Sequence, residues 1–475
     1  MHSESSQTNL SLRRLAPPLR KKSPREASRD RVLILTSGLG YGHVRAAQAV
    51  EAALLQRSMD VRILDLWSLM NPGAAAIVHQ TYLRLVQEYP DLYERIYQLD
   101  ERTWRQILES EAGPPPHVLE VLELISEIAA GSDAEAKSGG QYASDRFLLS
   151  LLYNSLPYNG ASLAGNGVRA RLAIMKWSWL RLSKRLESIV NSYAPDVIIG
   201  TQMIPAAMIS ALKRRNRIRV PLIGVLTDYG IHDFWRQRGV DRYCIAHSSI
   251  ATADHEPTQA IATGVPLMPA FTQPLSQVEA KRQLSLDPQR PYVLILGGGL
   301  GLSVDAIAAR LLERHSSKCS FIVMPGKNAN VRVALSRHLN RDGRSTSLGD
   351  ERMRIFDWTD RMDVFIRAAD IVVGKPGGVS VAEVLACGRP LLATRSLGGQ
   401  EGFNVRFLEQ NRVGALVPDT GLADRIDSMM ADSQSLAEMQ QRAWALGIRD
   451  GASRIAEMTL DFIARQRYQI AQESQ

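Results

Sequence analysis

The feature that most constrains this chain is a strand, turn, helix and strand pattern between residues 372 and 404. It reads V-V-G-K-P-G-G-V-S-V-A-E-V-L-A-C-G-R-P-L-L-A-T-R-S-L-G-G-Q-E-G-F-N. An apolar strand runs into a turn with Pro376, Gly377 and Gly378, and a helix opens at Val379. Paired glycines let backbone N–H groups approach an anion, and a helix N-terminus adds about half a positive charge there. The pattern therefore predicts a diphosphate site.

Polar residues follow at positions that suit the rest of a nucleotide sugar. Glu383 lies one helical turn inside, where its carboxylate can accept hydrogen bonds from a ribose diol. Gln400, Glu401 and Asn404 are predicted to form a polar cluster on the loop after the second strand, suited to sugar hydroxyls. The alternative is that the glycines only shape a turn and the polar residues are solvated. The two motifs at this spacing favour a nucleotide-sugar site.

The chain opens with a second unit of the same kind. Residues 31–36 (R-V-L-I-L-T) predict a buried strand, followed by S-G-L-G-Y-G-H, a helix over about 44–56 and a strand over 61–66. A dinucleotide-binding fingerprint would need a third glycine at position 43, where His43 stands. The spacing therefore disfavours a dinucleotide site.

His43 is the first candidate catalytic residue, because it sits at the carboxyl end of the first strand, where open α/β sheets bind ligands. An imidazole with a pKa near ~6.5 suits a general base. A structural helix-capping histidine is the alternative. Asp228 closes the strand P-L-I-G-V-L-T-D-Y, and His232 follows it. Asp228 is predicted to orient an imidazole or to act as the base itself, unless the two residues form a structural pair.

Several segments resemble one family of enzymes. They are G-Y-G-H-V-R-A-A, T-D-Y-G-I-H-D-F-W, T-G-V-P at 263–266, and K-P-G-G followed by G-Q-E. The set is similar to the monogalactosyldiacylglycerol synthases and processive diacylglycerol glucosyltransferases, which are inverting, family 28-like glycosyltransferases. The resemblance implies an α/β protein of the GT-B fold, in which two Rossmann-like domains face each other across a cleft. It covers about residues 30–417, and departs from the family at a Gly/Ser-rich insertion near 131–140 and at Leu300.

The resemblance also implies roles for individual residues. The histidine of G-x-G-H is implicated in catalysis, so His43 becomes the expected base beside Asp228 and His232. A second glycine run between a strand and a helix, G-G-G-L-G at 297–301, would face the donor diphosphate. The expected donor-binding residues are Gly42, Gly299, Leu300, Gly301, Thr359, Pro376, Gly377, Gly378, Val379, Glu383, Gln400, Glu401 and Asn404.

Length and composition support two domains. The chain has 475 residues, 45% of them hydrophobic, and a formal charge of +8. We predict a disordered basic tail (1–29) and an N-terminal acceptor and membrane-associating domain (30–270). A UDP-sugar-binding domain (271–446) follows, with a hinge near 271–276, and a final helical segment (447–475) crosses back to the first domain. The tail lacks the apolar region of a secretory signal, and no run is long enough to span a membrane.

The expected reaction is transfer of a hexose from a UDP-sugar to a lipid, most simply diacylglycerol, with inversion to a β-glycoside. No D-x-D triplet occurs, so we expect no metal or other cofactor. The three cysteines are far apart, which is typical of a reduced cytoplasmic protein. With a lipid acceptor, the expected location is the inner face of the membrane. Expected partners are UDP-glucose or UDP-galactose, the lipid and an anionic membrane surface, but no nucleic acid. Alternatives are a lipid-linked or lipid A-type acceptor, or a non-catalytic UDP-sugar sensor.

Overall fold

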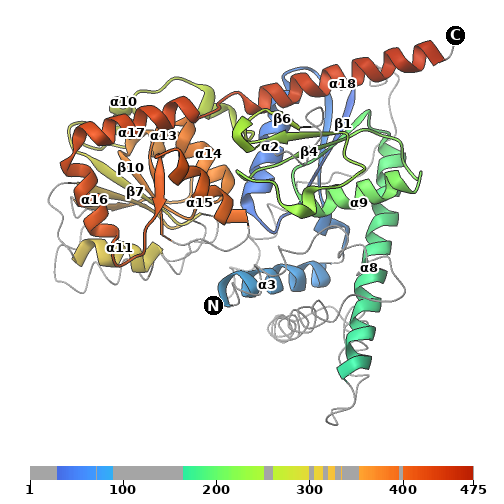
Figure 1. The fold of residues 1–475 in the computed structure, drawn as a ribbon, viewed down its shortest axis with the longest axis horizontal. Helices are drawn as coiled ribbons and strands as arrows, with labels where there is room; N and C mark the ends of the chain where they lie inside the picture. Colours follow the sequence, from blue (N-terminus) through green and yellow to red (C-terminus); the bar gives the residue numbers. More distant parts are fainter. Residues whose placement is uncertain are drawn as a thin grey trace, which may run out of the picture.

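Two parallel sheets organise the chain (Figure 1). The structure, a computed structural model, describes residues 29–70, 72–88, 164–250, 260–298, 304–313, 319–326, 333, 352–394 and 400–473. The first six-stranded sheet has, in spatial order, β2 (Asp60–Asp65), β1 (Arg31–Thr36), β3 (Val197–Gly200), β4 (Leu222–Val225), β5 (Arg242–Ile245) and β6 (Ala260–Ala262). The second has β12 (Gly414–Leu416), β11 (Leu391–Ala393), β10 (Ile371–Gly374), β7 (Tyr292–Leu296), β8 (Ser320–Met324) and β9 (Met353–Ile355).

Helices connect these strands and cover both sheets. Because the central strands β3, β4 and β10 are buried along their whole length, they carry nearly continuous apolar runs, as parallel strands covered on both faces do. The helices of the first half are α2 (Tyr41–Leu55), α3 (Pro72–Glu88), α8 (Ala164–Tyr193) and α9 (Met203–Arg214). Those that follow are α10 (Gln277–Gln283), α11 (Val304–Glu313), α13 (Met362–Ala368), α14 (Gly378–Ala386), α15 (Gln400–Gln410), α16 (Leu422–Ala431), α17 (Ser433–Leu446) and α18 (Gly451–Glu473).

Three details differ from the sequence-based expectation. Helix α2 begins at Tyr41, so Gly42 and His43 lie in its first turn rather than in the preceding loop. The prediction that residues 400–404 form a loop was wrong, because they open α15. The buried residues of α15 recur at helical spacing, and Gly402 weakened that signal. After α15, β12 adds a three-residue strand that was not among the expected elements.

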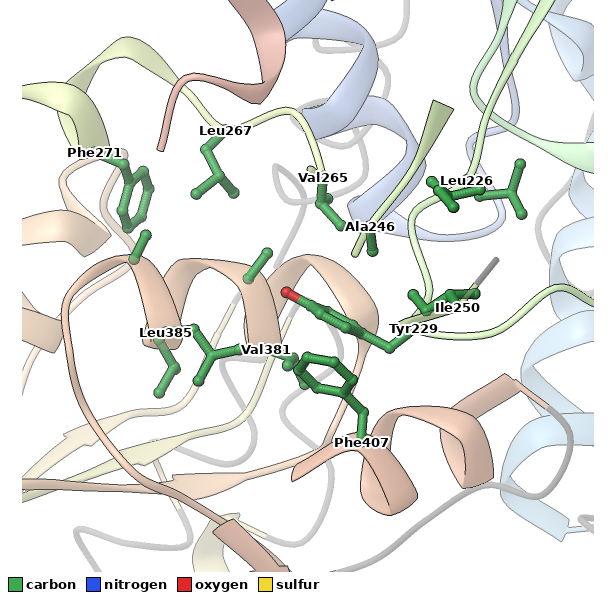
Figure 2. Packing of buried hydrophobic residues seen from close by; sticks show 14 of the residues in the cluster. Leu226, Tyr229, Ala246, Ile250, Val265, Leu267, Phe271, Val381, Leu385 and Phe407 are labelled. Atoms are coloured by element: carbon green, nitrogen blue, oxygen red, sulfur yellow. The ribbon is translucent and has the colours of Figure 1, made fainter. Parts of the chain in front are cut away.

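The two halves pack through a shared apolar core. One buried cluster joins residues of the first half, among them Leu226 and Tyr229, to Val381 of α14 and Phe407 of α15 (Figure 2). The rings of Tyr229 and Phe407 lie 4.3 Å apart between centroids. The contact between the halves is therefore held by ordinary hydrophobic burial, which leaves polar groups at the interface for other tasks.

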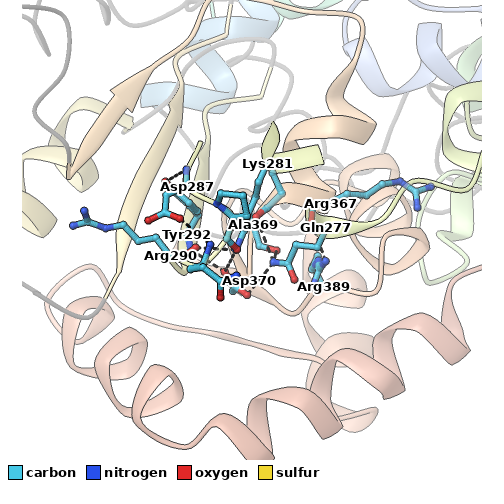
Figure 3. Close-up of polar contacts among 12 residues, drawn as sticks. Gln277, Lys281, Asp287, Arg290, Tyr292, Arg367, Ala369, Asp370 and Arg389 are labelled. Carbon is cyan, nitrogen blue, oxygen red and sulfur yellow. Dashed lines mark hydrogen bonds and ion pairs between the residues drawn. The ribbon is translucent and has the colours of Figure 1, made fainter. Parts of the chain in front are cut away.

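A buried polar network anchors the segment that links the halves (Figure 3). Arg367 of α13 donates hydrogen bonds of 3.0 Å to the main-chain carbonyls of Phe271 and Gln273. Nearby, Asp370 accepts a bond of 2.9 Å from Gln277 and pairs with Lys281 at 3.8 Å. Arg367 of the second half therefore binds the main chain at Phe271 and Gln273, within the predicted hinge at 271–276.

The last helix crosses back to the first sheet. Figure 1 shows α18 running from the second half across the first, where it packs against α2. Its Ile455 and Ala456 are buried in the same cluster as Val32 of β1. A Cβ on Gly451 would lie 2.9 Å from the carbonyl oxygen of Val265, so the T-G-V-P element touches the start of this helix.

Some predictions concern residues that the structure does not describe. These are the tail at 1–28, the Gly/Ser-rich insertion at 131–140 and the phosphate-loop residues 299–301. Within the described ranges, no helix combines the length and apolar character that crossing a bilayer requires.

Candidate active site

Two helix N-termini meet between the sheets. Helix α2 follows β1 and α14 follows β10, so both begin at the carboxyl ends of their strands. A Cβ on Gly42 would lie 3.3 Å from Cγ2 of Val379, and a Cβ on Gly378 would overlap the carbonyl oxygen of Thr227. The first turns of the two helices are therefore in contact, and glycine is required at position 378 for this approach.

A narrow pocket opens beside this contact and combines residues of both halves. Its lining residues are His43, Gln202, Met203, Leu226, Asp228, Gly230, His232, Trp235 and Gln400. All three predicted catalytic residues thus share one pocket with the predicted sugar-binding residue Gln400. This juxtaposition is what a transfer reaction between a donor held by one half and an acceptor held by the other needs.

The hydrogen bonds of His43 define its tautomer. Nδ1 lies 2.9 Å from the carbonyl oxygen of Thr201, and because a carbonyl only accepts, Nδ1 carries hydrogen. Nε2 therefore holds the lone pair of the neutral ring. Burial lowers the pKa of His43 below its usual value, whereas the charge of Asp228 and the bond to Thr201 act in the raising direction. The imidazole is neutral near pH 7 and ready to accept a proton at Nε2.

His232 has the opposite tautomer. Its Nδ1 accepts a hydrogen bond of 3.1 Å from the backbone N–H of Phe234, so the hydrogen of the neutral ring is on Nε2. A ring in this state donates from Nε2 rather than removing a proton. Of the two histidines predicted to be catalytic, His43 alone has the tautomer of a base.

Asp228 is held by a residue of the other half. Its Oδ1 accepts a hydrogen bond of 2.9 Å from Nδ2 of Asn404. Nδ2 of Asn404 also donates to the carbonyl oxygen of Pro376 at 2.9 Å. Oδ1 of Asn404 accepts a hydrogen bond of 2.7 Å from the N–H of Tyr229. Both hydrogens of this amide are used within the protein, so in this arrangement the side chain has no hydrogen left for a sugar hydroxyl.

The start of α14 presents an open surface toward the cleft. A Cβ on Gly377, the residue preceding the helix, would meet no atom of the described residues within 4 Å, in contrast to Gly378 beside it. No acidic side chain lies in the first turn of α14. The amides of a first turn have no acceptor within the helix, and together with the macrodipole they favour an anion. Pro376 contributes its carbonyl to Asn404 and Val379 packs toward Gly42, so both border the same site.

Glu383 and its neighbours form the side of the cleft next to α2. Burial raises the pKa of the Glu383 carboxyl to about 7, while Arg45 of the first half lowers it and Asp363 raises it. Arg45 also pairs with Asp360 at 3.1 Å across the cleft. The adjacent Thr359 accepts a hydrogen bond from the N–H of Arg361 through Oγ1. A polar corner one helical turn from the anion site suits a ribose.

Glu401 is a buried charge with a partner. It is 2% exposed, and its Oε1 lies 2.7 Å from Nζ of Lys375 in the K-P-G-G turn. The pair ties the start of α15 to the anion-binding turn. Lys375 adds positive charge there, and sequence analysis did not single it out.

Sequence analysis also missed Thr201, Thr227 and Arg45. Thr201 follows β3, and Thr227 lies on the loop after β4, so both occupy carboxyl-end positions that marked His43 and Asp228 as candidates. The same signal was therefore available. Arg45 gave no such signal, because only the packing of the two halves brings it beside Asp360. Of the predicted site residues, Gly299, Leu300 and Gly301 lie outside the described ranges. Of the others, His43, Asp228, His232 and Gln400 line the pocket, Gly42, Gly378 and Val379 form the contact between α2 and α14, and Glu401 and Asn404 are buried.

Metal binding has no candidate cluster here. In the part of the chain that the structure describes, no group of three or more His, Cys, Asp or Glu side chains is arranged to hold an ion.

Two family models and several curated glycosyltransferases are similar to this chain. A monogalactosyldiacylglycerol (MGDG) synthase model matches residues 151–267, and a glycosyltransferase family 28 C-terminal domain model matches residues 292–455. The processive diacylglycerol β-glucosyltransferase of Bacillus subtilis is 23% identical over 436 residues, which cover 90% of this chain and 94% of that protein. The enzyme of the same name from Bacillus licheniformis is 26% identical over 278 residues, covering 57% and 70%.

Solved structures show the fold. MurG of Acinetobacter baumannii matches with a TM-score of 0.53 at 12% identity, covering 91% of this chain and 99% of MurG. The kitacinnamycin glycotransferase matches with a TM-score of 0.50 at 12% identity, covering 92% and 99%. The predicted GT-B architecture and the predicted family resemblance are confirmed. The chain thus matches a monogalactosyldiacylglycerol synthase model in one half and a family 28 C-terminal domain model in the other, and it is similar over 90% of its length to a processive diacylglycerol β-glucosyltransferase.

Proposed function

We propose that the protein transfers a hexose from UDP-glucose or UDP-galactose to diacylglycerol and inverts the anomeric carbon to a β-glycoside. The observation that carries this proposal is the shared pocket, which is lined both by His43, whose neutral ring has its lone pair on Nε2, and by Gln400. The names of the Bacillus relatives support diacylglycerol as the acceptor and glucose as the sugar.

The donor would lie along the second half. The open amides at Gly377 and the first turn of α14 would hold the diphosphate, Glu383 the ribose, and Gln400 the sugar. Lys375 stands beside Glu401 at the same turn, where it adds positive charge. Backbone amides and these side chains supply the anion stabilisation, so the proposal requires no bound metal ion.

The chemical step would then be a single displacement. The acceptor hydroxyl oxygen attacks the anomeric carbon, and its proton passes to Nε2 of His43. The bond between the anomeric carbon and the diphosphate oxygen breaks, and its electron pair leaves with UDP. Negative charge grows on the diphosphate during this step, where the N-terminus of α14 stabilises it. His232, which donates from Nε2, is placed to bind an oxygen of donor or acceptor in the same pocket.

The acceptor would reach the pocket from a membrane surface. The outer face of α8 carries exposed Leu180 together with Arg181, Lys184 and Arg185. Cations beside an apolar residue are attracted to anionic lipid, each contributing on the order of 1 kcal/mol near the surface. We therefore place the enzyme at the inner face of the membrane.

The direct test is product formation from defined substrates. The protein is incubated with vesicles of phosphatidylglycerol and diacylglycerol and with radiolabelled UDP-glucose or UDP-galactose, and the lipids are separated by chromatography. We expect label in a β-hexosyl diacylglycerol with one of the donors. Label that appears only when a lipid extract replaces diacylglycerol would identify another acceptor. Tight donor binding without any UDP release, with either acceptor, would show a sensor and refute the enzyme.

The neighbouring glycines allow a matched pair of substitutions. Gly377→Ala fits the protein without a clash, so the melting temperature should stay close to that of the wild type, while the new methyl group intrudes on the diphosphate and weakens UDP binding. Gly378→Ala overlaps the Thr227 carbonyl and should lower the melting temperature. Calorimetric titration with UDP and thermal unfolding measure both. Unchanged UDP affinity in Gly377→Ala would remove the anion site from this turn.

Glu383 gives the donor affinity a pH dependence. Its pKa of about 7 means that the carboxyl is largely protonated at pH 6 and ionised at pH 8. If the carboxylate accepts the ribose hydroxyls, UDP-glucose affinity should rise with pH, by up to about tenfold over this range. UDP-glucose is the proper probe, because its diphosphate is a diester without a proton to lose here. Glu383→Gln should bind more weakly, with no such rise. A wild-type affinity that is flat from pH 6 to pH 8 would contradict the ribose role.

A further inference from the structure

Asn404 connects α15, whose Gln400 borders the sugar pocket, to the Asp228 carboxylate beside the proposed base. It lies on α15, one turn after Gln400, and is 0% exposed. Its amide bridges the halves, because it bonds Asp228 and Tyr229 of the first half and Pro376 of the second. One end of α15 therefore borders the sugar pocket, while Asn404 holds the carboxylate beside His43.

The orientation of this amide is determined by its backbone partners. The N–H of Tyr229 needs an acceptor and the carbonyl of Pro376 needs a donor, so Oδ1 must face the first and Nδ2 the second. The remaining hydrogen on Nδ2 then points to Oδ1 of Asp228. A hydrogen bond to a carboxylate is stronger than one between neutral groups, and losing it leaves the carboxylate short of a partner.

The bridge is not needed simply to hold the halves together. Tyr229 and Phe407 already pack against each other at the interface, within an apolar cluster that spans both halves (Figure 2). The polar bridge adds a defined position for the Asp228 carboxylate, which the packing alone does not supply.

We propose that Asn404 is a positioning residue for the base: from the half that carries the predicted donor-binding residues, it orients the Asp228 carboxylate beside His43. This inference rests on the proposed function for its kinetic consequence. It differs from the expectation that Asn404 binds a sugar hydroxyl, and the two roles predict opposite changes in donor affinity and turnover.

The kinetic test uses Asn404→Leu, which keeps the number and branching of the side-chain heavy atoms and removes the amide. We expect kcat to fall by about 10- to 100-fold, as for a weakened general base, with the UDP-glucose dissociation constant changed by less than about threefold. Asp228→Asn should fall similarly, and adding Asn404→Leu to it should cost little more, because both act through one carboxylate. Phe407→Leu, an apolar docking contact on the same helix, is the control. It should lower the melting temperature, with kcat within about threefold of the wild type.

A second readout does not depend on any acceptor. The protein has nine histidines, so ¹³C-labelled histidine and a His43→Gln variant allow the His43 signal to be assigned and titrated by NMR. Among the described residues, the charged or titratable groups that line the pocket with His43 are Asp228 and His232. Helix α15 contributes the uncharged Gln400 to the pocket, and Val379 of α14 faces Gly42, the neighbour of His43. Asp228 raises the pKa of His43. Asn404→Leu should therefore lower it, in the same direction as Asp228→Asn, with no further fall in the double variant.

The outcomes separate the possibilities. A raised donor dissociation constant with unchanged kcat would make Asn404 a sugar ligand and overturn the proposal. An unchanged His43 pKa in Asn404→Leu, or fully additive losses in the double variant, would overturn it as well. If the wild type transfers no sugar but the pKa of His43 falls as expected, the positioning role stands and the proposed function alone fails.

Discussion

The close approach of two helix N-termini governs the rest of this structure. Gly378 of α14 lies so near the Thr227 carbonyl that any Cβ would overlap it, and Gly42 of α2 faces Val379. This contact brings the carboxyl ends of two sheets to one place, and with them the loops that carry polar side chains. Positive helix ends from both halves then point into the same cleft, which is a natural place for a diphosphate and for the charge that leaves with it.

The hydrogen-bond partners of the two histidines decide which one can act as the base. Thr201 and Phe234 assign opposite tautomers to His43 and His232, and only the first leaves a lone pair at Nε2. Burial and the nearby Asp228 shift the pKa of His43 in opposite directions. The result is a neutral imidazole at physiological pH with a carboxylate available to stabilise it once it is protonated.

Much of this arrangement was predictable from the sequence, because it depends on local patterns. Buried parallel strands are short apolar runs, and each candidate residue followed such a run, so His43, Asp228 and Gly377 were found from their positions at strand ends. The family resemblance supplied the GT-B fold, and the position of Glu383 one helical turn after the glycines suggested its ribose role. Contacts that depend on pairing between distant segments were not predictable. Asn404 resembles a solvated loop residue until α15 forms and buries it, and Arg45 meets Asp360 only across the cleft.

The account depends most on His43 being the proton acceptor in a cleft that holds the donor independently of it. The most direct measurement compares His43→Ala with the wild type in two assays, UDP affinity by calorimetry and transfer of labelled hexose to diacylglycerol. The account predicts that UDP affinity stays within about threefold, while transfer falls by about 10²- to 10⁴-fold, the usual contribution of a general base. Undiminished transfer in His43→Ala would contradict it.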